Sequence, residues 1–175
     1  MLSVVLNLSL VAAVVFFIAG PPLTLLHELG HALLLSLAGH SATIYLGRPD
    51  PRARSTFRLG KVEARIRRPL GFGGICHYEE PENGFSPEGE LLIALGGPAA
   101  SALAALAFGL AAYLSPDNPL SGLLGAISIG AFLQFFLSMI PVRYPRWLGA
   151  AGGRPSDGLR IMRAMGFGQN EEKPL

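Results

Sequence analysis

The chain has 175 residues, of which 50% are hydrophobic and only 15% are charged, and its mean hydropathy is +0.43. Soluble domains carry about 25% charged residues, so this composition argues against a soluble domain and indicates a membrane protein. The net charge of +2 does not indicate nucleic-acid binding, because basic and acidic residues are interleaved in the polar intervals. We therefore expect a single membrane-embedded domain over residues 1–175, with no nucleic-acid partner.

The first apolar block, Leu2 to Gly39, has 38 residues and only three ionisable side chains, His27, Glu28 and His31. As a straight helix it would measure roughly 57 Å, against about 30 Å for the hydrocarbon core of a bilayer. Proline disrupts a helix, so the sequence Gly20–Pro22 predicts either one long, kinked span or a hairpin of two spans. A secretory signal peptide is a third interpretation, but the basic n-region is missing.

The interval from residue 41 to residue 90 is polar. Its segments ATIYLG, STFRLG and KVEARIRR alternate polar and apolar residues between Pro and Gly, which is typical of short strands. The segment GFGGICHY has the same character, weakened by its glycines. This interval therefore predicts a small β-strand region between two membrane-spanning segments.

Two further blocks, residues 91–114 and 120–140, have the length of transmembrane helices and carry no charge. The short turn around Pro116–Asn118 makes them antiparallel neighbours. The last interval, residues 142–175, contains Pro, Gly and Arg and ends in a short amphipathic helix predicted from DGLRIMRAM. The expected fold is an α-helical polytopic membrane protein whose core has three transmembrane helices, or four if the first block is a hairpin.

The basic residues predict the orientation in the membrane. Eight Lys and Arg residues lie between residues 41 and 88 and six follow Pro141, whereas the turn Ser115–Asn118 has none. Cytoplasmic loops carry the excess of basic residues in membrane proteins. We therefore expect the strand region and the C-terminus in the cytoplasm of a multi-pass protein.

The sequence HELGH places three ionisable groups inside the first apolar block. Such groups are costly in a bilayer unless they are paired, so they indicate a functional site. On a helix His27 and His31 share one face and can bind one zinc ion, and Glu28 then lies near the zinc and acts as general base. Gly30 allows another backbone to approach closely. The alternative is a pair of core histidines held by ordinary hydrogen bonds.

A catalytic zinc usually has three protein ligands, so a third ligand is needed. Asp157 differs from the other acidic residues because it occurs in SDG, follows the last apolar block and begins a predicted helix on the cytoplasmic side. The remaining candidates lie in polar intervals where a solvated role is the simpler interpretation: Asp50, Glu63, Glu79, Glu80, Glu82, Glu88, Glu90 and Asp117.

The order of motifs resembles the site-2-protease family of intramembrane zinc metalloproteases. The matching segments are HELGH in an apolar block, PLGFGG after the strands, GGP at a transmembrane helix, SMIP, and DG. The resemblance implies one zinc ion per chain, with His27, His31 and Asp157 as ligands and Glu28 as catalytic base. It also implies cleavage of transmembrane or membrane-associated proteins within or near the lipid bilayer, and it favours one kinked first span.

Four other residues are expected to support the substrate or the transition state. Ser101 and Ser138 stand where the family usually has Asn, and Gly73 and Gly74 flank a strand edge on which an extended substrate could pair. A non-proteolytic module of the same family that binds a metal or a helix is the alternative function. A zinc protease with a Glu as third ligand is a second alternative. Cys76 and His77 fit a strand cysteine and an interfacial histidine better than a metal site.

Overall fold

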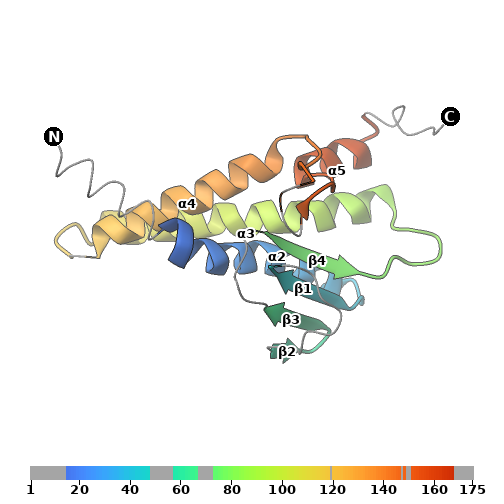
Figure 1. The fold of residues 1–175 in the computed structure, drawn as a ribbon, viewed down its shortest axis with the longest axis horizontal. Helices are drawn as coiled ribbons and strands as arrows, with labels where there is room; N and C mark the ends of the chain where they lie inside the picture. The colour runs from blue at the N-terminus through green and yellow to red at the C-terminus, as the bar shows by residue number, and fades with distance from the viewer. Residues whose placement is uncertain are drawn as a thin grey trace.

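The computed structural model describes residues 15–47, 57–66, 73–118, 120–146, 148 and 151–167. The elements in chain order are η1 (Val15–Ala19), α2 (Gly20–Leu37), β1 (Ala42–Leu46), β2 (Phe57–Leu59), β3 (Val62–Ile66), β4 (Gly74–Tyr78), α3 (Pro87–Leu114), α4 (Ser121–Met139) and α5 (Asp157–Ala164). The described fold is thus mixed, with three long helices, one small sheet and a short final helix (Figure 1).

The chain does not turn back at Gly20–Pro22. The π-helix η1 continues directly into α2, so the backbone is helical from Val15 to Leu37. Both prolines lie in the first turn of α2, directly after the junction with η1. The described residues therefore contain no hairpin at this position. Residues 1–14 lie outside the described part, so the number of crossings made by residues 1–39 stays a prediction.

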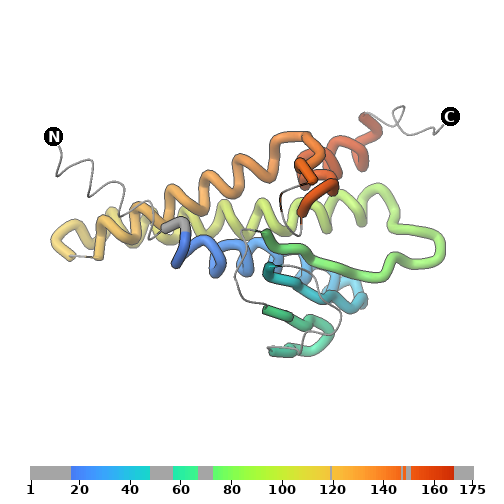
Figure 2. The backbone as a smooth tube through the Cα atoms, viewed as in Figure 1, coloured from blue at the N-terminus to red at the C-terminus, as the bar shows by residue number. Residues whose placement is uncertain are grey.

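The predicted strands form one sheet with the order β2-β3-β1-β4. The central strand β1 is parallel to β3 and antiparallel to β4. Its buried residues Ala42 and Ile44 pack against Ala32 and Leu35 of α2 and form a small apolar core. Among the described residues β4 pairs with β1 alone, so β4 is an edge strand, and it lies beside α2 (Figure 2).

Helix α3 begins at Pro87, four residues before the predicted start at residue 91. The Ser86 side chain accepts a hydrogen bond from the Gly89 N–H, and Pro87 is well suited to the first helical position. Glu88 and Glu90 lie in the first turn, where their negative charges interact favourably with the positive end of the helix dipole. The prediction that left these two acids outside the helix was wrong, because the absence of charge defined only the apolar part of the helix.

Helices α3 and α4 are long and apolar enough to cross a membrane, with 28 and 19 residues and mean hydropathies of 2.0 and 1.8. Only 11% of the apolar stretch of α4 is buried within the protein. Phe132, Leu133 and Phe136 each expose more than half of their surface. An apolar surface of this extent needs lipid or another protein to cover it. Helix α2, which contains HELGH, is less apolar than α3 and α4 because of its three ionisable side chains.

Candidate metal centre

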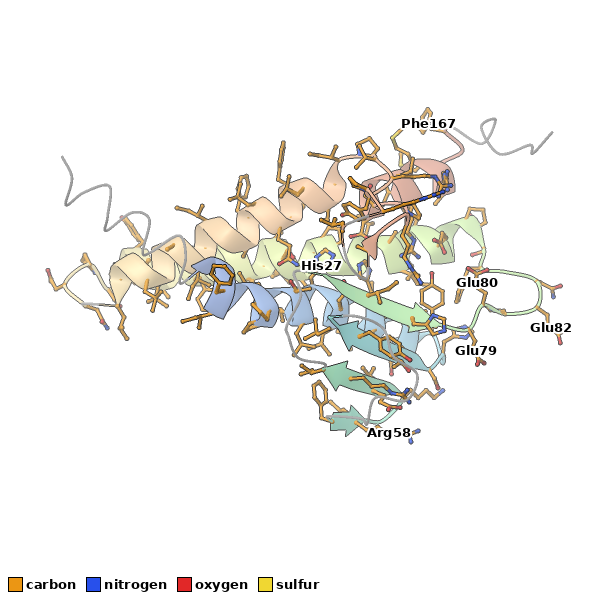
Figure 3. All side chains as sticks on the ribbon, viewed as in Figure 1. His27, Arg58, Glu79, Glu80, Glu82 and Phe167 are labelled. Carbon is orange, nitrogen blue, oxygen red and sulfur yellow. The ribbon has the colours of Figure 1, made fainter. Side chains whose placement is uncertain are left out.

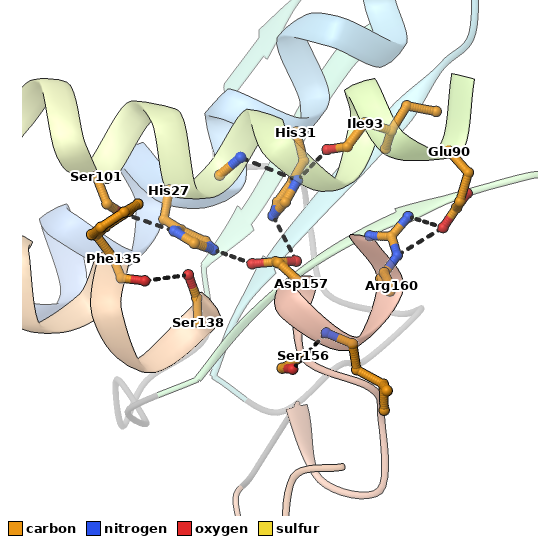
Figure 4. A network of polar contacts seen from close by, with 12 residues as sticks. His27, His31, Glu90, Ile93, Ser101, Phe135, Ser138, Ser156, Asp157 and Arg160 are labelled. Atoms are coloured by element: carbon orange, nitrogen blue, oxygen red, sulfur yellow. Dashed lines mark hydrogen bonds and ion pairs between the residues drawn. The ribbon is translucent and has the colours of Figure 1, made fainter. Parts of the chain in front are cut away.

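The side chains of His27, His31 and Asp157 meet at one point between α2 and α5 (Figure 4). The Nε2 atom of His27 lies 3.0 Å from Oδ2 of Asp157, and Nε2 of His31 lies 3.3 Å from Oδ1. Both histidines are at least 95% buried. All three ligand atoms lie within 4.8 Å of one another, so this group could hold a metal ion.

The other nitrogen of each imidazole, Nδ1, contacts a residue of helix α3. His31 Nδ1 lies 2.7 Å from the Ile93 carbonyl oxygen, which can only accept, so Nδ1 carries the proton. The Gly97 N–H is 3.2 Å from the same nitrogen, but it cannot donate to a protonated Nδ1. His27 Nδ1 lies 2.9 Å from Ser101 Oγ, which can accept in the same way. Both Nε2 atoms face the Asp157 carboxylate: protonated, they donate to it, and unprotonated, they can bind a metal ion.

This arrangement suits a cation, because neutral imidazole nitrogens and carboxylate oxygens are all acceptors. Zinc binds nitrogen and oxygen ligands at about 2.0–2.1 Å in a tetrahedron, which places neighbouring ligand atoms about 3.3 Å apart. The separations of 3.0 and 3.3 Å, which reach different oxygens of the Asp157 carboxylate, are close to that spacing. Two imidazoles and one carboxylate are a ligand set that zinc accepts, and a fourth position would remain for water or substrate.

Gly97 leaves the space beside both Nε2 atoms free of a side chain. A Cβ at this position would lie 2.6 Å from Nε2 of His27 and closer still to Nε2 of His31. Helix α3 approaches α2 this closely because Gly30 and Gly96 place backbone against backbone: a Cβ on Gly96 would lie 2.5 Å from the Gly30 carbonyl oxygen. The expectation that Gly30 permits close approach is confirmed. The role of Gly97 was missed, although the GGP sequence was the signal.

Asp157 reaches the histidines because Ser156 anchors the start of α5. Ser156 is fully buried, and its hydroxyl donates to the Ile140 carbonyl oxygen at 2.6 Å. The Ser156 hydroxyl oxygen also accepts from the N–H groups of Val142 and Leu159, and its bond with Leu159 caps α5. One serine thus joins the end of α4 to the start of α5.

Gly158 completes this junction. A Cβ on Gly158 would lie 2.5 Å from the carbonyl carbon of Met139, so only glycine lets α5 pack on the last turn of α4. Each residue of the SDG sequence therefore has a separate task. Ser156 anchors the start of α5, Asp157 faces the histidines, and Gly158 allows α5 to contact the last turn of α4.

Arg160 fixes the orientation of α5 from the other side. Its guanidinium lies 2.7 Å from the Glu90 carboxylate on α3 and donates to the Tyr78 hydroxyl on β4 at 2.6 Å. The three side chains are partly buried, so this ion pair is shielded from water. Glu90 was predicted to be a solvated acid, and that prediction was wrong. Its pairing with Arg160 depends on a contact across 70 residues that no local pattern reveals.

Glu28 lies between the two histidines and strand β4. The backbone N–H of Cys76 is a hydrogen-bond donor to its carboxylate. Gly74 makes room, since a Cβ there would lie 2.7 Å from Cγ of Glu28. Gly73 is buried, and its carbonyl oxygen accepts from the Gly47 N–H at 3.1 Å. Gly74 thus supports the position of Glu28, whereas the Gly73 carbonyl is already paired with the segment after β1.

A cavity of about 1430 Å³ opens onto this centre. Its walls are α2, the edge strand β4, one face of α4, the segment after α4, and α5. Ser138 lies in the α4 wall and donates its hydroxyl to the Phe135 carbonyl oxygen of its own helix. Ser101 lies behind His27. Neither serine therefore directs a free donor at the centre in this structure.

The charges around the centre have distinct causes. Burial alone raises the pKa of the Asp157 carboxyl, but its hydrogen bonds with His27 and His31 outweigh burial and hold that pKa well below its ordinary value. Burial raises the pKa of the Cys76 thiol to about 12, helped by the nearby Glu28. Burial also raises the pKa of Tyr78 to about 12. Cys76 and Tyr78 are therefore neutral at pH 7.

Most other predicted candidates lie away from the histidines. Glu79 and Glu82 lie on the loop after β4, far from His27 (Figure 3). Asp50 lies outside the described residues. Within the described part of the chain, the group that could hold a metal contains neither Cys76 nor His77. His77 is exposed and contacts the Tyr45 ring.

No protein-family model matches the chain, and no curated protein matches it. The class of the protein rests on its own fold and site. It is a mixed helical and β protein with two helices of membrane-spanning length and a buried His-His-Asp group that could hold a metal ion.

Proposed function

We propose that this protein is an intramembrane zinc metalloprotease of the site-2-protease type, with one zinc ion held by His27, His31 and Asp157. The observation that supports this most strongly is the position of Asp157. Its carboxylate lies 3.0 and 3.3 Å from two histidines more than 120 residues earlier in the chain, inside a cavity that also contains Glu28.

The chemistry follows from the ligands and from Glu28. When bound here, zinc supplies Lewis acidity that activates water and polarises a peptide carbonyl. Glu28 accepts the proton that water loses as its oxygen attacks the carbonyl carbon. Glu28 then donates this proton to the amine nitrogen as the C–N bond breaks. The Cys76 N–H holds the Glu28 carboxylate in place.

The cavity is suited to an extended peptide. One wall is the edge strand β4, whose outer edge has no strand partner among the described residues. The opposite wall is an apolar face of α4 that includes Ile129, Leu133 and Leu137. A locally unwound membrane helix can offer its backbone to the strand and its apolar side chains to α4. Transmembrane or membrane-associated proteins are therefore the proposed substrates.

The membrane placement rests on α3 and α4. Their exposed apolar surface would be covered by lipid in a multi-pass protein. The distribution of Lys and Arg would place the strand region and the C-terminus in the cytoplasm.

The proposal is tested with the full chain purified in detergent and incubated with synthetic transmembrane peptides. We expect cleavage that a chelator stops and that added zinc restores. Glu28→Gln should keep zinc and lose cleavage, because Gln cannot accept the proton. Peptide binding without cleavage, under conditions where zinc is bound, would contradict proteolysis and support the alternative of a non-proteolytic binding module.

A further inference from the structure

Tyr144 lies in the wall of the cavity that contains Glu28 and Asp157. It belongs to the segment between α4 and α5. Its phenol is partly buried and interacts electrostatically with both carboxylates. None of the motifs in the sequence includes this residue.

The backbone around Tyr144 is held on both sides. Its N–H donates to the Arg154 carbonyl oxygen at 2.9 Å, and its carbonyl oxygen accepts from the Gly153 N–H at 2.9 Å. Arg143 and Pro155 form a β-bridge beside this pair. The segment is therefore a small hairpin that ends at the anchored Ser156, one residue before Asp157. This hairpin ties the position of Tyr144 to that of the proposed ligand.

The Tyr144 hydroxyl is available as a donor. In the part of the chain that the structure describes, it forms no hydrogen bond with protein. Of the two serines expected to support the reaction, Ser101 lies behind His27 and is not part of the cavity wall, and Ser138 donates to the Phe135 carbonyl oxygen. Peptide hydrolysis needs a donor for the negative charge that develops on the carbonyl oxygen.

We propose that Tyr144 is a catalytic residue that donates a hydrogen bond to this developing oxyanion. The inference rests on the proposed function. As the water oxygen bonds to the carbonyl carbon, the π electrons of the C=O bond move to its oxygen, and the Tyr144 O–H stabilises them. When the C=O bond forms again, the C–N bond breaks and the nitrogen takes the proton from Glu28. Tyr144 keeps its own proton throughout.

The surroundings of Tyr144 keep its hydroxyl protonated. Burial raises the pKa of Tyr144 to about 12, and the nearby Asp157 and Glu28 add to the effect. The phenol is therefore protonated at neutral pH and can donate.

The test compares Tyr144→Phe with wild type, both as full chains loaded with zinc in detergent. We expect kcat to fall by about 100-fold or more, as is typical for loss of an oxyanion donor, with little change in KM or zinc content. A peptide phosphinate, whose tetrahedral anion mimics the transition state, should bind at least about 10-fold more weakly to Tyr144→Phe. Tyr113→Phe is the matched control, because Tyr113 on α3 is 79% exposed and outside the cavity.

The outcomes separate the two proposals. Cleavage by wild type that requires Glu28 but is unchanged in Tyr144→Phe would overturn the role of Tyr144 alone. Loss of zinc or of the folded state in Tyr144→Phe would also overturn it, since the residue would then act through structure. No cleavage by zinc-loaded wild type would overturn the proposed function and this inference together.

Discussion

Gly97 on α3 lies so close to His31 on α2 that a Cβ at position 97 would collide with its Nε2 atom. We expect an ion bound to this nitrogen to need the space beside it. Gly97→Ala should therefore lower zinc affinity by at least about 10-fold, or displace α3 from α2. The measurement is zinc content after purification, followed by titration of the apo protein.

The matched control for that substitution is Gly125→Ala on α4, where a Cβ would meet nothing within 4 Å. It should bind zinc like wild type. Full zinc affinity in Gly97→Ala would contradict a metal site at this position.

The assignment of Asp157 as the third ligand leads to a second expected outcome. Purified wild type should carry about one zinc per chain, and Asp157→Ala, His27→Ala and His31→Ala should each lose most of it. Metal analysis of the purified proteins measures this. Glu88→Ala is the control, since Glu88 lies in the exposed first turn of α3. Equal zinc in Asp157→Ala and wild type would remove Asp157 from the ligand set.

Arg160 should stabilise the packing of α5 against α3. Arg160→Met removes the ion pair with Glu90 and the bond to Tyr78, and we expect it to lower the free energy of unfolding by about 2 kcal/mol. Zinc should also dissociate faster, because Asp157 is on the same helix. A double-mutant cycle with Glu90→Gln measures the coupling between the two residues. A coupling energy near zero would mean that the ion pair does not hold α5.

Cys76 should react slowly with thiol reagents. Its pKa of about 12 leaves only about one thiolate in 10,000 molecules at pH 8, and the rate should rise about tenfold for each pH unit up to pH 11. Stopped-flow maleimide labelling gives the rate. His77→Cys in a Cys76→Ser background is the control, because position 77 is exposed on the same strand. Equal rates at pH 8 would contradict the buried thiol.

The orientation of the chain can be tested in cells. The distribution of basic residues predicts that a reporter fused after Leu175 reads cytoplasmic and that one inserted at Asn118 reads external. The same readings are not expected for a soluble protein, in which both reporters would share one compartment. An external reading at Leu175 would reverse the predicted topology.

The sequence alone determined the parts of this protein that depend on local patterns. Charge-free blocks gave α4 to within one residue at each end, and alternation gave the four short strands. The spacing of His27 and His31 placed both on one face of α2, because a helix brings residues four apart together. The SDG sequence placed Asp157 at the start of a helix, which the structure confirms.

Only the tertiary structure decided how these parts meet. The pairing of Arg160 with Glu90, the space left by Gly97 and the engagement of Ser101 by His27 all join different helices. Such contacts depend on how closely the helices pack, and backbone contacts at Gly30 and Gly158 bring α3 against α2 and α5 against α4. Periodicity reports which face of a helix is apolar, but it does not report which atom of another helix lies opposite.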